Sequence, residues 1–300
     1  MQKKKNFLIK KTFNYTAPLF RHPNSFHHLF YLHFHCRSLS LYLSRCPLCL
    51  QLFGCSAAAQ VKTSRDTKGQ FLSVNMAFSV GVMSAMYLTK GITVSVCLGQ
   101  VPWGRLLPYC LSQVLGAYVA SGLVYLVYYD AIMDFSGGVL TVYGPNETAS
   151  IFATYPSEFL TLGRSFLDQV IGTAMLMLCI LGLGEKRNTP APEELIPPIV
   201  AVIVLGISMS MSANCGAAIN PARDLGPRLF TLTAGWGTEV FKCYNYWFWV
   251  PLVAPLIGGV LGTFMYLIFI DWHLPDPEPP VEPSKLSTIS DSVKNFMYYL

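Results

Sequence analysis

The sequence contains few charged residues. Asp, Glu, Lys and Arg make up only 12% of its 300 residues, about half of the roughly 25% that soluble proteins carry. It also lacks a phosphate-binding loop and any pairing of a nucleophile with a base, so we do not expect an enzyme. Hydrophobic residues make up 52% of the chain, and the mean hydropathy is +0.42. This composition favours a membrane protein over a soluble domain.

Patterns that bind metals are equally sparse. Cys46 and Cys49 form one CxxC, but no second pair follows at the spacing of a zinc site. The first 37 residues hold five of the six histidines, among aromatic residues and lysines: His22, His27, His28, His33 and His35. An unstructured or interfacial segment fits this composition better than a metal site, and we expect no metal and no cofactor. The open alternative is a membrane enzyme that uses these histidines and cysteines, and it would bind metal stoichiometrically.

Long apolar runs, by contrast, are frequent. Five of them are near the ~20 residues that cross a hydrocarbon core of about 30 Å: Phe71 to Gly91, Leu106 to Tyr129, Phe166 to Gly184, Leu195 to Met211 and Trp247 to Ile270. A further span, the first in the chain, is expected from Ser38 to Ala59, although it contains Arg45 and Pro47. An arginine at the centre of a span costs about 2.5 to 3.5 kcal/mol on insertion scales. We therefore expect an all-α membrane protein.

The distribution of charge predicts the topology. Lysines precede the first span, Arg105 follows the second, and Lys186 with Arg187 follows the fourth, which places both termini in the cytoplasm under the positive-inside rule. The net charge of +5 therefore indicates orientation and not binding to nucleic acid. We divide the chain into an irregular basic segment (1–37), a membrane domain (38–270) and a disordered cytoplasmic tail (271–300), because the tail is polar and rich in proline.

One glycosylation acceptor agrees with this topology. Asn146, Glu147 and Thr148 form an N-x-T sequon, and the loop from Asp130 to Arg164 that contains it is predicted to face outward. Three basic residues in another outer loop oppose the rule: Lys62, Arg65 and Lys68.

An internal repeat is suggested by two proline-to-glycine segments of equal length. Pro108 to Gly116 and Pro251 to Gly259 each follow a tryptophan-bearing junction and each lie within a long span. Three spans and one short helix per half would place the second half in inverted orientation, with a pore along the pseudo-two-fold axis.

The segment from Ser212 to Phe230 is too short and too rich in glycine to cross the membrane. Pro221 suits the first position of a helix, and Asn220 is a favourable cap directly before it. The pattern predicts a short helix from Pro221 to Leu232 that begins at membrane depth. We expect Asn214 to Ile219 to be extended and to expose carbonyls to a water-filled path.

This helix start has a definite chemistry. The Asn220 amide can donate to a passing water or hydroxyl group, and the helix amino end contributes roughly half a positive charge. Arg223 adds a permanent charge one turn away, so neutral solutes would pass and protons would not. The alternative for Arg223 is a snorkelling arginine at the membrane interface. We expect Asp224 to neutralise the region in part and to hold the loop.

The stretch NPARDLGPRLFTLTAGWG resembles the second signature loop of the aquaglyceroporins, in which Asp follows Asn-Pro-Ala-Arg. The resemblance extends from Leu52 to Ile270 and includes VPWGRLLPY, LVYYDAI, GPNETASIFATYPS and WVPLVAPLIG. It implies an aquaporin-like bundle of six transmembrane helices with an inverted repeat and two re-entrant half-helices. It also implies a homotetramer in the plasma membrane, each protomer a passive channel for water and glycerol, with urea as a further small neutral solute.

The resemblance also assigns site residues. The pore motif would be Asn220, Pro221 and Ala222, and the selectivity filter Phe78, Ser208, Ala217 and Arg223, with ordinary helix packing the alternative for Phe78. The pore-lining loop would be Asn214, Cys215 and Gly216, with Asp224 and Asp168 in support. Ser208 stands where glycine is common and Ala217 where an aromatic residue often stacks on glycerol, so the pore should be wider than usual.

The chain departs from the family at its first Asn-Pro-Ala loop. The sequence continues from Thr93 to Val94 where about seven residues, including that motif, are expected, so the first half-helix would be truncated. Leu43 stands where the family places a buried glutamate in the first span. The alternative to a working channel is therefore a non-conducting or impaired protein of the same fold.

Overall fold

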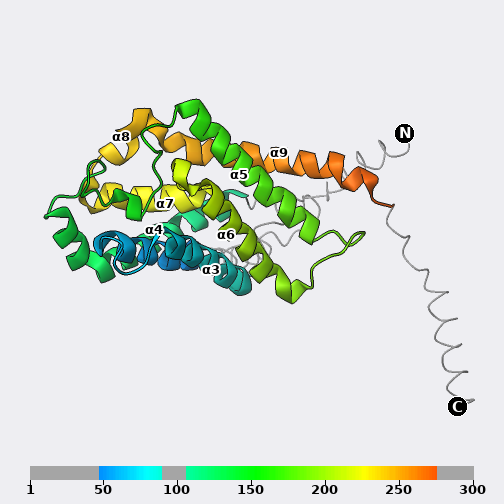
Figure 1. Ribbon diagram of the computed structural model, residues 1–300, viewed down its shortest axis with the longest axis horizontal. Coiled ribbons are helices and arrows are strands. Elements are labelled where there is room, and N and C mark those ends of the chain that lie inside the picture. Colours follow the sequence, from blue (N-terminus) through cyan, green and yellow to red (C-terminus); the bar gives the residue numbers. More distant parts are fainter. Residues whose placement is uncertain (1–46, 90–105, 276–300) are drawn as a thin grey trace, which may run out of the picture.

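The computed structural model describes residues 47–89 and 106–275, and its regular elements there are all helices (Figure 1). The long ones are residues 47–63, α3 (Phe71–Thr89), α4 (Leu106–Ser136), α5 (Leu162–Leu183), α6 (Ile196–Cys215) and α9 (Val250–Phe269). Two shorter helices, α7 (Pro221–Thr231) and α8 (Glu239–Tyr246), come between α6 and α9. The connections carry single turns: η2 (Ala149–Ile151), η3 (Glu193–Leu195), η4 (Leu232–Trp236), η5 (Trp247–Trp249) and η6 (Asp271–His273).

Five of these helices are long and apolar enough to cross a membrane, and they coincide with the five apolar runs in the sequence. The first expected span is described only from residue 47, and its helix continues to residue 63, past the expected end at Ala59. The other part of that span, with Leu43 and Arg45, lies outside the described residues. So do the N-terminal histidines, the junction at Thr93 and Val94, and the tail from residue 276.

The helices form an elongated bundle with α7 on its inside (Figure 1). We call the end that carries residues 62–70, 137–161 and 232–249 the loop end, and the end that carries residues 184–195 and 270–275 the tail end. α7 packs against α4 on one side and against α9 on the other, while α3 packs against α6 and α5 against α9. A short helix enclosed by longer ones agrees with the predicted re-entrant half-helix.

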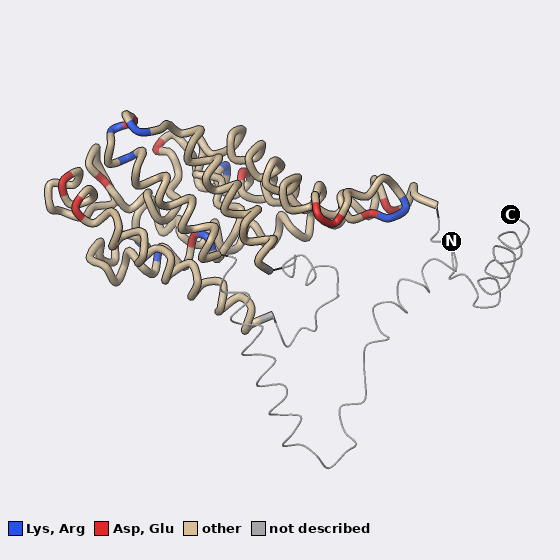
Figure 2. Tube along the Cα trace, turned by 90° about the horizontal axis from the view of Figure 1, so that it is seen from below, with Lys and Arg blue, Asp and Glu red and all other residues tan. Residues whose placement is uncertain are grey.

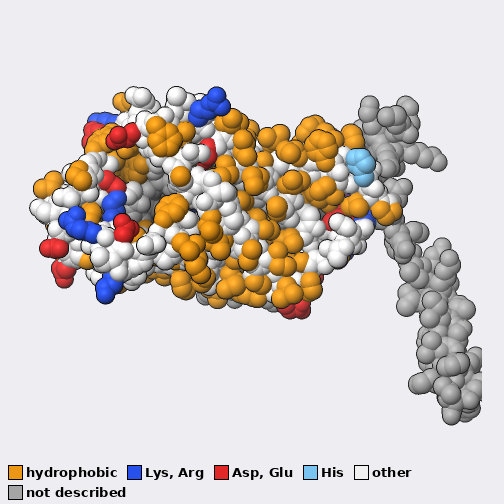
Figure 3. Space-filling view, viewed as in Figure 1, with side chains coloured by type: hydrophobic (Ala, Val, Ile, Leu, Met, Phe, Trp, Pro, Cys, Tyr) orange, Lys and Arg blue, Asp and Glu red, His pale blue; other side chains and the backbone are white. Residues whose placement is uncertain are grey.

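Many charged residues lie toward the two ends of the bundle (Figure 2), and the face in Figure 3 is apolar around its middle. Large apolar side chains on the long helices stand outward, as at Leu126 (73% exposed), Val127 (78%) and Val202 (67%). Such a belt would be unfavourable in water and is what a helix bundle presents to lipid. The protein is therefore a multi-pass membrane protein.

Glycines allow the helices to approach closely. A Cβ atom on Gly226 of α7 would lie 2.6 Å from the Val114 carbonyl of α4, and one on Gly258 of α9 would lie 2.5 Å from the Val170 carbonyl of α5. Without a hydrophobic force between helices in lipid, such close backbone packing is a main source of association. These glycines set the position of α7 inside the bundle.

Polar contacts fasten both ends. At the loop end the Lys62 ammonium pairs with the Glu147 carboxylate and donates to the Ser150 hydroxyl at 2.7 Å. Residues 62 and 147 thus lie at the same end of the bundle, as the predicted topology requires. At the tail end Arg187 pairs with Glu185 and with Asp271, which connects the α5–α6 segment to the end of α9.

Candidate functional site

A cavity of about 1460 Å³ lies within the bundle. It extends from Lys62 and Arg65 at the loop end to Met86 of α3 and Ile180 of α5 in the tail-end half. Its walls come from residues 47–63, α3, α5, α6, α7 and α9. The cavity therefore follows the direction in which the helices cross the membrane, and the amino end of α7 lies along it.

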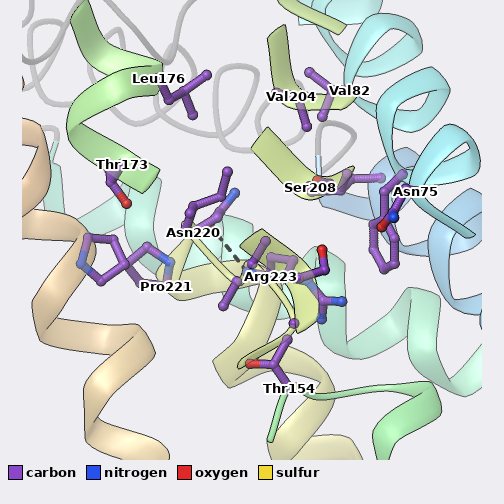
Figure 4. Close-up of a pocket in the computed structure, with 18 of the residues that line it drawn as sticks. Asn75, Val82, Thr154, Thr173, Leu176, Val204, Ser208, Asn220, Pro221 and Arg223 are labelled. Carbon is purple, nitrogen blue, oxygen red and sulfur yellow. Dashed lines mark hydrogen bonds between the residues drawn. The ribbon is translucent and has the colours of Figure 1, made fainter. Parts of the chain in front are cut away.

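Asn220 begins α7 at this cavity (Figure 4). Its side-chain oxygen accepts from the backbone N–H groups of Ala222 at 3.0 Å and Arg223 at 3.3 Å. Pro221 occupies the first turn, and the helix ends at Thr231, one residue before the predicted end. Because the cap uses the oxygen, the amide nitrogen remains as the group that can donate to a molecule in the cavity.

Arg223 borders the same cavity and is only 8% exposed. Its guanidinium donates to the Phe152 carbonyl at 3.0 Å and lies 4.4 Å from the centre of the Phe78 ring. Its own carbonyl accepts from the fully buried Gln51 side chain at 2.5 Å. Among the described residues no carboxylate lies within ion-pairing distance of Arg223. The guanidinium is thus held by a carbonyl and an aromatic ring, and it has no ion pair in the part of the chain that the structure describes.

Asp224, which we expect to neutralise the region in part and to hold the loop, forms no ion pair with Arg223. Its carboxylate pairs instead with Arg228 at 2.8 Å, where both side chains are almost fully buried. It also accepts from the backbone N–H and the hydroxyl of Thr154, so the expected hold on the loop is present. A buried charge requires a partner of opposite sign, and the i,i+4 spacing on α7 provides it.

Arg228 is a residue that the sequence analysis missed. Its guanidinium also donates to the Val240 carbonyl at 2.7 Å and lies 4.6 Å from the centre of the Tyr155 ring. It thereby connects α7 to α8 and to the segment after η2. The four-residue spacing from Asp224 to Arg228 was the signal that could have revealed the pair.

The segment before α7 differs from the extended conformation expected for Asn214 to Ile219. Asn214 and Cys215 complete α6, and Gly216 then takes the left-handed conformation with φ of 73°. Ala217 and Ile219 also have positive φ, 42° and 37°. Such conformations cost free energy for residues with a Cβ atom, so the surrounding contacts must hold them.

Side chains of α5 provide those contacts. Asp168 accepts from the Asn214 amide at 2.7 Å and from the Cys215 thiol at 2.9 Å. Gln169, which the sequence analysis did not select, accepts from the Ile219 N–H at 2.8 Å. Of the three expected pore-lining residues only Gly216 borders the cavity, because Asn214 and Cys215 turn toward Asp168.

The four predicted filter residues all border the cavity: Phe78, Ser208, Ala217 and Arg223. They come from α3, α6, the segment before α7 and α7 itself. Gly54 of the first helix was missed, although any Cβ atom there would clash with the Phe78 ring. Phe78 both packs against this glycine and faces Arg223, so helix packing and a place in the cavity wall do not exclude each other.

Within residues 47–89 and 106–275, no three His, Cys, Asp or Glu side chains gather as they would around a metal ion. Cys49 is a free, half-buried cysteine, whereas its expected partner Cys46 is outside the described residues. The membrane enzyme alternative depends on those undescribed residues.

An apolar helix bundle with a long cavity, and with the amino end of a short helix at that cavity, is an architecture that suits a transmembrane channel. Residues 46–266 match the family model for the major intrinsic proteins. The chain belongs to this family, whose members are channels, and it is therefore a channel and not an enzyme.

Relatives agree with this assignment. The Asn-Cys-Gly sequence before α7 and the Asn146 sequon predict a likeness to aquaporin ten within the family. Human aquaporin-10 is 47% identical over 241 residues, covering 77% of this chain and 80% of that protein. Human aquaporin-9 is 40% identical over 239 residues, covering 76% of this chain and 81% of that protein.

A solved structure supports the fold. The X-ray structure of the aquaglyceroporin from Plasmodium falciparum superposes with a TM-score of 0.68 at 23% identity. It covers 78% of this chain and 96% of its own. The aquaporin-like fold predicted from the sequence is thus confirmed, while the truncated first half-helix falls in the undescribed residues 90–105.

Proposed function

We propose that this chain is a passive transmembrane channel for glycerol and water, with urea and other small neutral solutes as further permeants. The observation that carries the proposal is the juxtaposition of Asn220, Arg223 and Phe78 along one cavity. Two polar groups donate hydrogen bonds there, and an apolar ring lies beside them. Glycerol likewise has a polar side, formed by its hydroxyl groups, and an apolar side, formed by its carbon atoms.

Passage needs no covalent step, because the solute moves down its own gradient. The Asn220 amide and the Arg223 guanidinium replace hydrogen bonds that the solute loses with its hydration shell. The Phe78 ring contacts the carbon backbone on the opposite side. Small residues at Ser208 and Ala217 leave room for a molecule larger than water.

Charge selection follows from the same groups. The amino end of α7 contributes roughly half a positive charge, and Arg223 adds a full one without a carboxylate partner among the described residues. Both raise the energy of a cation or a hydronium ion in the passage. Neutral solutes are unaffected by this barrier.

The assembly and location follow by extension from the family resemblance. We propose a homotetramer in the plasma membrane, with both termini in the cytoplasm and the loop end outside. The apolar belt faces lipid or neighbouring protomers, and nucleic acid is not a partner. Asn146, which is exposed at the loop end, is the proposed glycosylation site.

Osmotic experiments on liposomes test this function. The purified chain in liposomes should accelerate both water efflux and glycerol entry over those of empty liposomes in stopped-flow light scattering. Sucrose entry should stay at the background rate, because the proposed permeants are small neutral solutes and not disaccharides. Rates equal to those of empty liposomes would favour the non-conducting alternative raised by the missing first motif.

A further inference from the structure

Among the described residues, one buried side-chain amide has no hydrogen-bond partner. Asn75 of α3 is 5% exposed, and its side-chain nitrogen makes no hydrogen bond. In the described part of the chain only one other buried side-chain atom lacks a hydrogen-bond partner, the Tyr155 hydroxyl. Both residues border the cavity. A buried polar group without a partner is costly and rare. Asn75 borders the cavity, so a rotation of its side chain would bring the amide within reach of a molecule in the passage.

The orientation of α3 explains why this amide faces inward. Val74, Asn75, Phe78 and Val82 border the cavity at helical spacing, whereas Leu72, Met76 and Val80 are exposed on the opposite, lipid-facing side. A polar side chain buried in a membrane bundle costs free energy when nothing hydrogen-bonds to it, and such residues commonly mark a solute path. The backbone carbonyl of Asn75 accepts from the Ser79 hydroxyl at 2.9 Å. This bond does not involve the side-chain amide nitrogen.

Asn75 also lies close to the filter residues along the helix. It precedes Phe78 by three residues, a rise of about 4.5 Å, and Phe78 contacts Arg223. Figure 4 shows Asn75 on α3 together with Ser208 on α6 and Arg223 among the residues that line the cavity. An amide at this level adds a hydrogen-bonding group on the α3 wall, across from α7.

We propose that Asn75 is a specificity-determining residue of the channel, at which a hydroxyl group of a polyol is hydrogen-bonded during passage. This inference rests on the proposed glycerol function. A neutral amide can donate to and accept from the same hydroxyl group. Glycerol loses more hydrogen bonds to water on entering the passage than a water molecule does. Its carbon atoms also keep neighbouring waters from replacing those hydrogen bonds. Loss of the amide therefore slows glycerol more than water.

The test is the ratio of glycerol to water permeability in liposomes. Asn75→Leu keeps a similar shape and removes the amide, so glycerol permeability should fall about tenfold, the effect of one lost hydrogen bond. Water permeability should fall less than about twofold, since water retains its other partners. Asn75→Ser, which keeps a side chain able to donate and accept hydrogen bonds, should recover most of the ratio. Met76→Leu, on the lipid-facing side of the same helix, is the matched control and should match the parent.

The possible outcomes distinguish a failure of this inference from a failure of the proposed glycerol function on which it rests. A parent chain without glycerol flux would remove the proposed function and this inference together. If the parent conducts and Asn75→Leu keeps its glycerol-to-water ratio, the inference is wrong while the function stands. A parallel fall of both permeabilities, or an Asn75→Ser variant with the ratio of Asn75→Leu, would show a purely structural role and also overturn it.

Discussion

At the scale of residues, two arginines on one short helix have opposite surroundings. Arg228 forms a buried ion pair with Asp224. Arg223 instead contacts a carbonyl and an aromatic ring beside the cavity. Four residues after Asn220, Asp224 thus provides a carboxylate that pairs with Arg228, and Arg223 has no ion pair among the described residues. This division assigns one arginine to stability and the other to selection.

Removing the charge at Arg223 should open the channel to protons. The Arg223→Val variant loses the barrier of a full positive charge in a narrow passage, whereas Arg223→Lys retains it. Liposomes loaded with a pH-sensitive dye and placed in a pH gradient should acidify measurably faster with Arg223→Val than with the parent. Arg223→Val liposomes that stay as proton-tight as the parent would contradict the assigned role.

Breaking the buried pair should destabilise the protein strongly. Asp224→Asn leaves the Arg228 charge buried without its partner, and such a loss costs about 3 to 5 kcal/mol. The measured quantity is the free energy of unfolding, or the melting temperature, of the protein in detergent. Adding Arg228→Met to Asp224→Asn should recover part of the loss, since no charge then remains. An Asp224→Asn variant as stable as the parent would show that the pair contributes nothing.

At the scale of elements, the position of α7 depends on its contact with α4. Gly226 lies against the α4 backbone so closely that a methyl group would meet the Val114 carbonyl at 2.6 Å and the Ala117 side chain at 2.6 Å. Since the neighbour is backbone, it cannot move aside cheaply. The contact of Gly226, in the middle of α7, with α4 therefore sets the position of the amino end of α7, where Asn220 lies.

Gly226→Ala should separate α7 from α4. Overpacking of this kind costs about 1 to 3 kcal/mol, so thermal unfolding in detergent should occur at a lower temperature than in the parent. Gly163→Ala is the matched control, because that glycine lies in the first turn of α5 with nothing within 4 Å of an added methyl group. It should be neutral or slightly stabilising, and equal effects of the two substitutions would contradict the packing argument.

The link between the α5–α6 segment and α9 should depend on pH. Hydrogen bonds from Arg187 lower the pKa of Glu185 from 4.5 to about 2, burial opposes this shift, and the Tyr266 hydroxyl supports it. A carboxyl group whose pKa is depressed in the folded state stabilises that state above its unfolded pKa. This stabilisation is lost as the pH falls through the folded value.

Between pH 4.5 and about 2 the parent should therefore lose more thermal stability than Glu185→Gln, which has no carboxyl group to protonate. Melting temperatures of both proteins in detergent across this range measure the difference. Identical pH profiles would mean that the Glu185 contact does not contribute to stability.

At the scale of the whole molecule, much of the fold could be predicted because a membrane restricts the length and composition of the helices that cross it. A span must be apolar over about 20 residues, so five helices could be located from hydropathy alone. The Asn-Pro pair predicted the start of α7, because proline and asparagine suit only a few helix positions. The side chains that hold this helix could not be predicted. Gln51 and Arg223 are 172 positions apart, and no local pattern brings them together.

Other features required the packed structure. The expectation for Asn214 to Ile219 was wrong because α6 continues to Cys215 and only then turns. Gly54 and Asn75 were not selected, since a small residue or an amide in an apolar run gives no periodic signal. Their meaning appears only when the Phe78 ring and the cavity are in place.

The central claim is that solutes cross this protein through the cavity beside Ser208 and Arg223, and one paired measurement tests it most directly. Glycerol uptake is recorded by stopped-flow light scattering for liposomes that contain equal amounts of the parent or of Ser208→Trp. The indole of that variant would obstruct the cavity beside Arg223. The account predicts uptake well above empty liposomes for the parent and close to empty liposomes for the variant. Equal uptake by the two proteins, or no uptake above background by the parent, would contradict it.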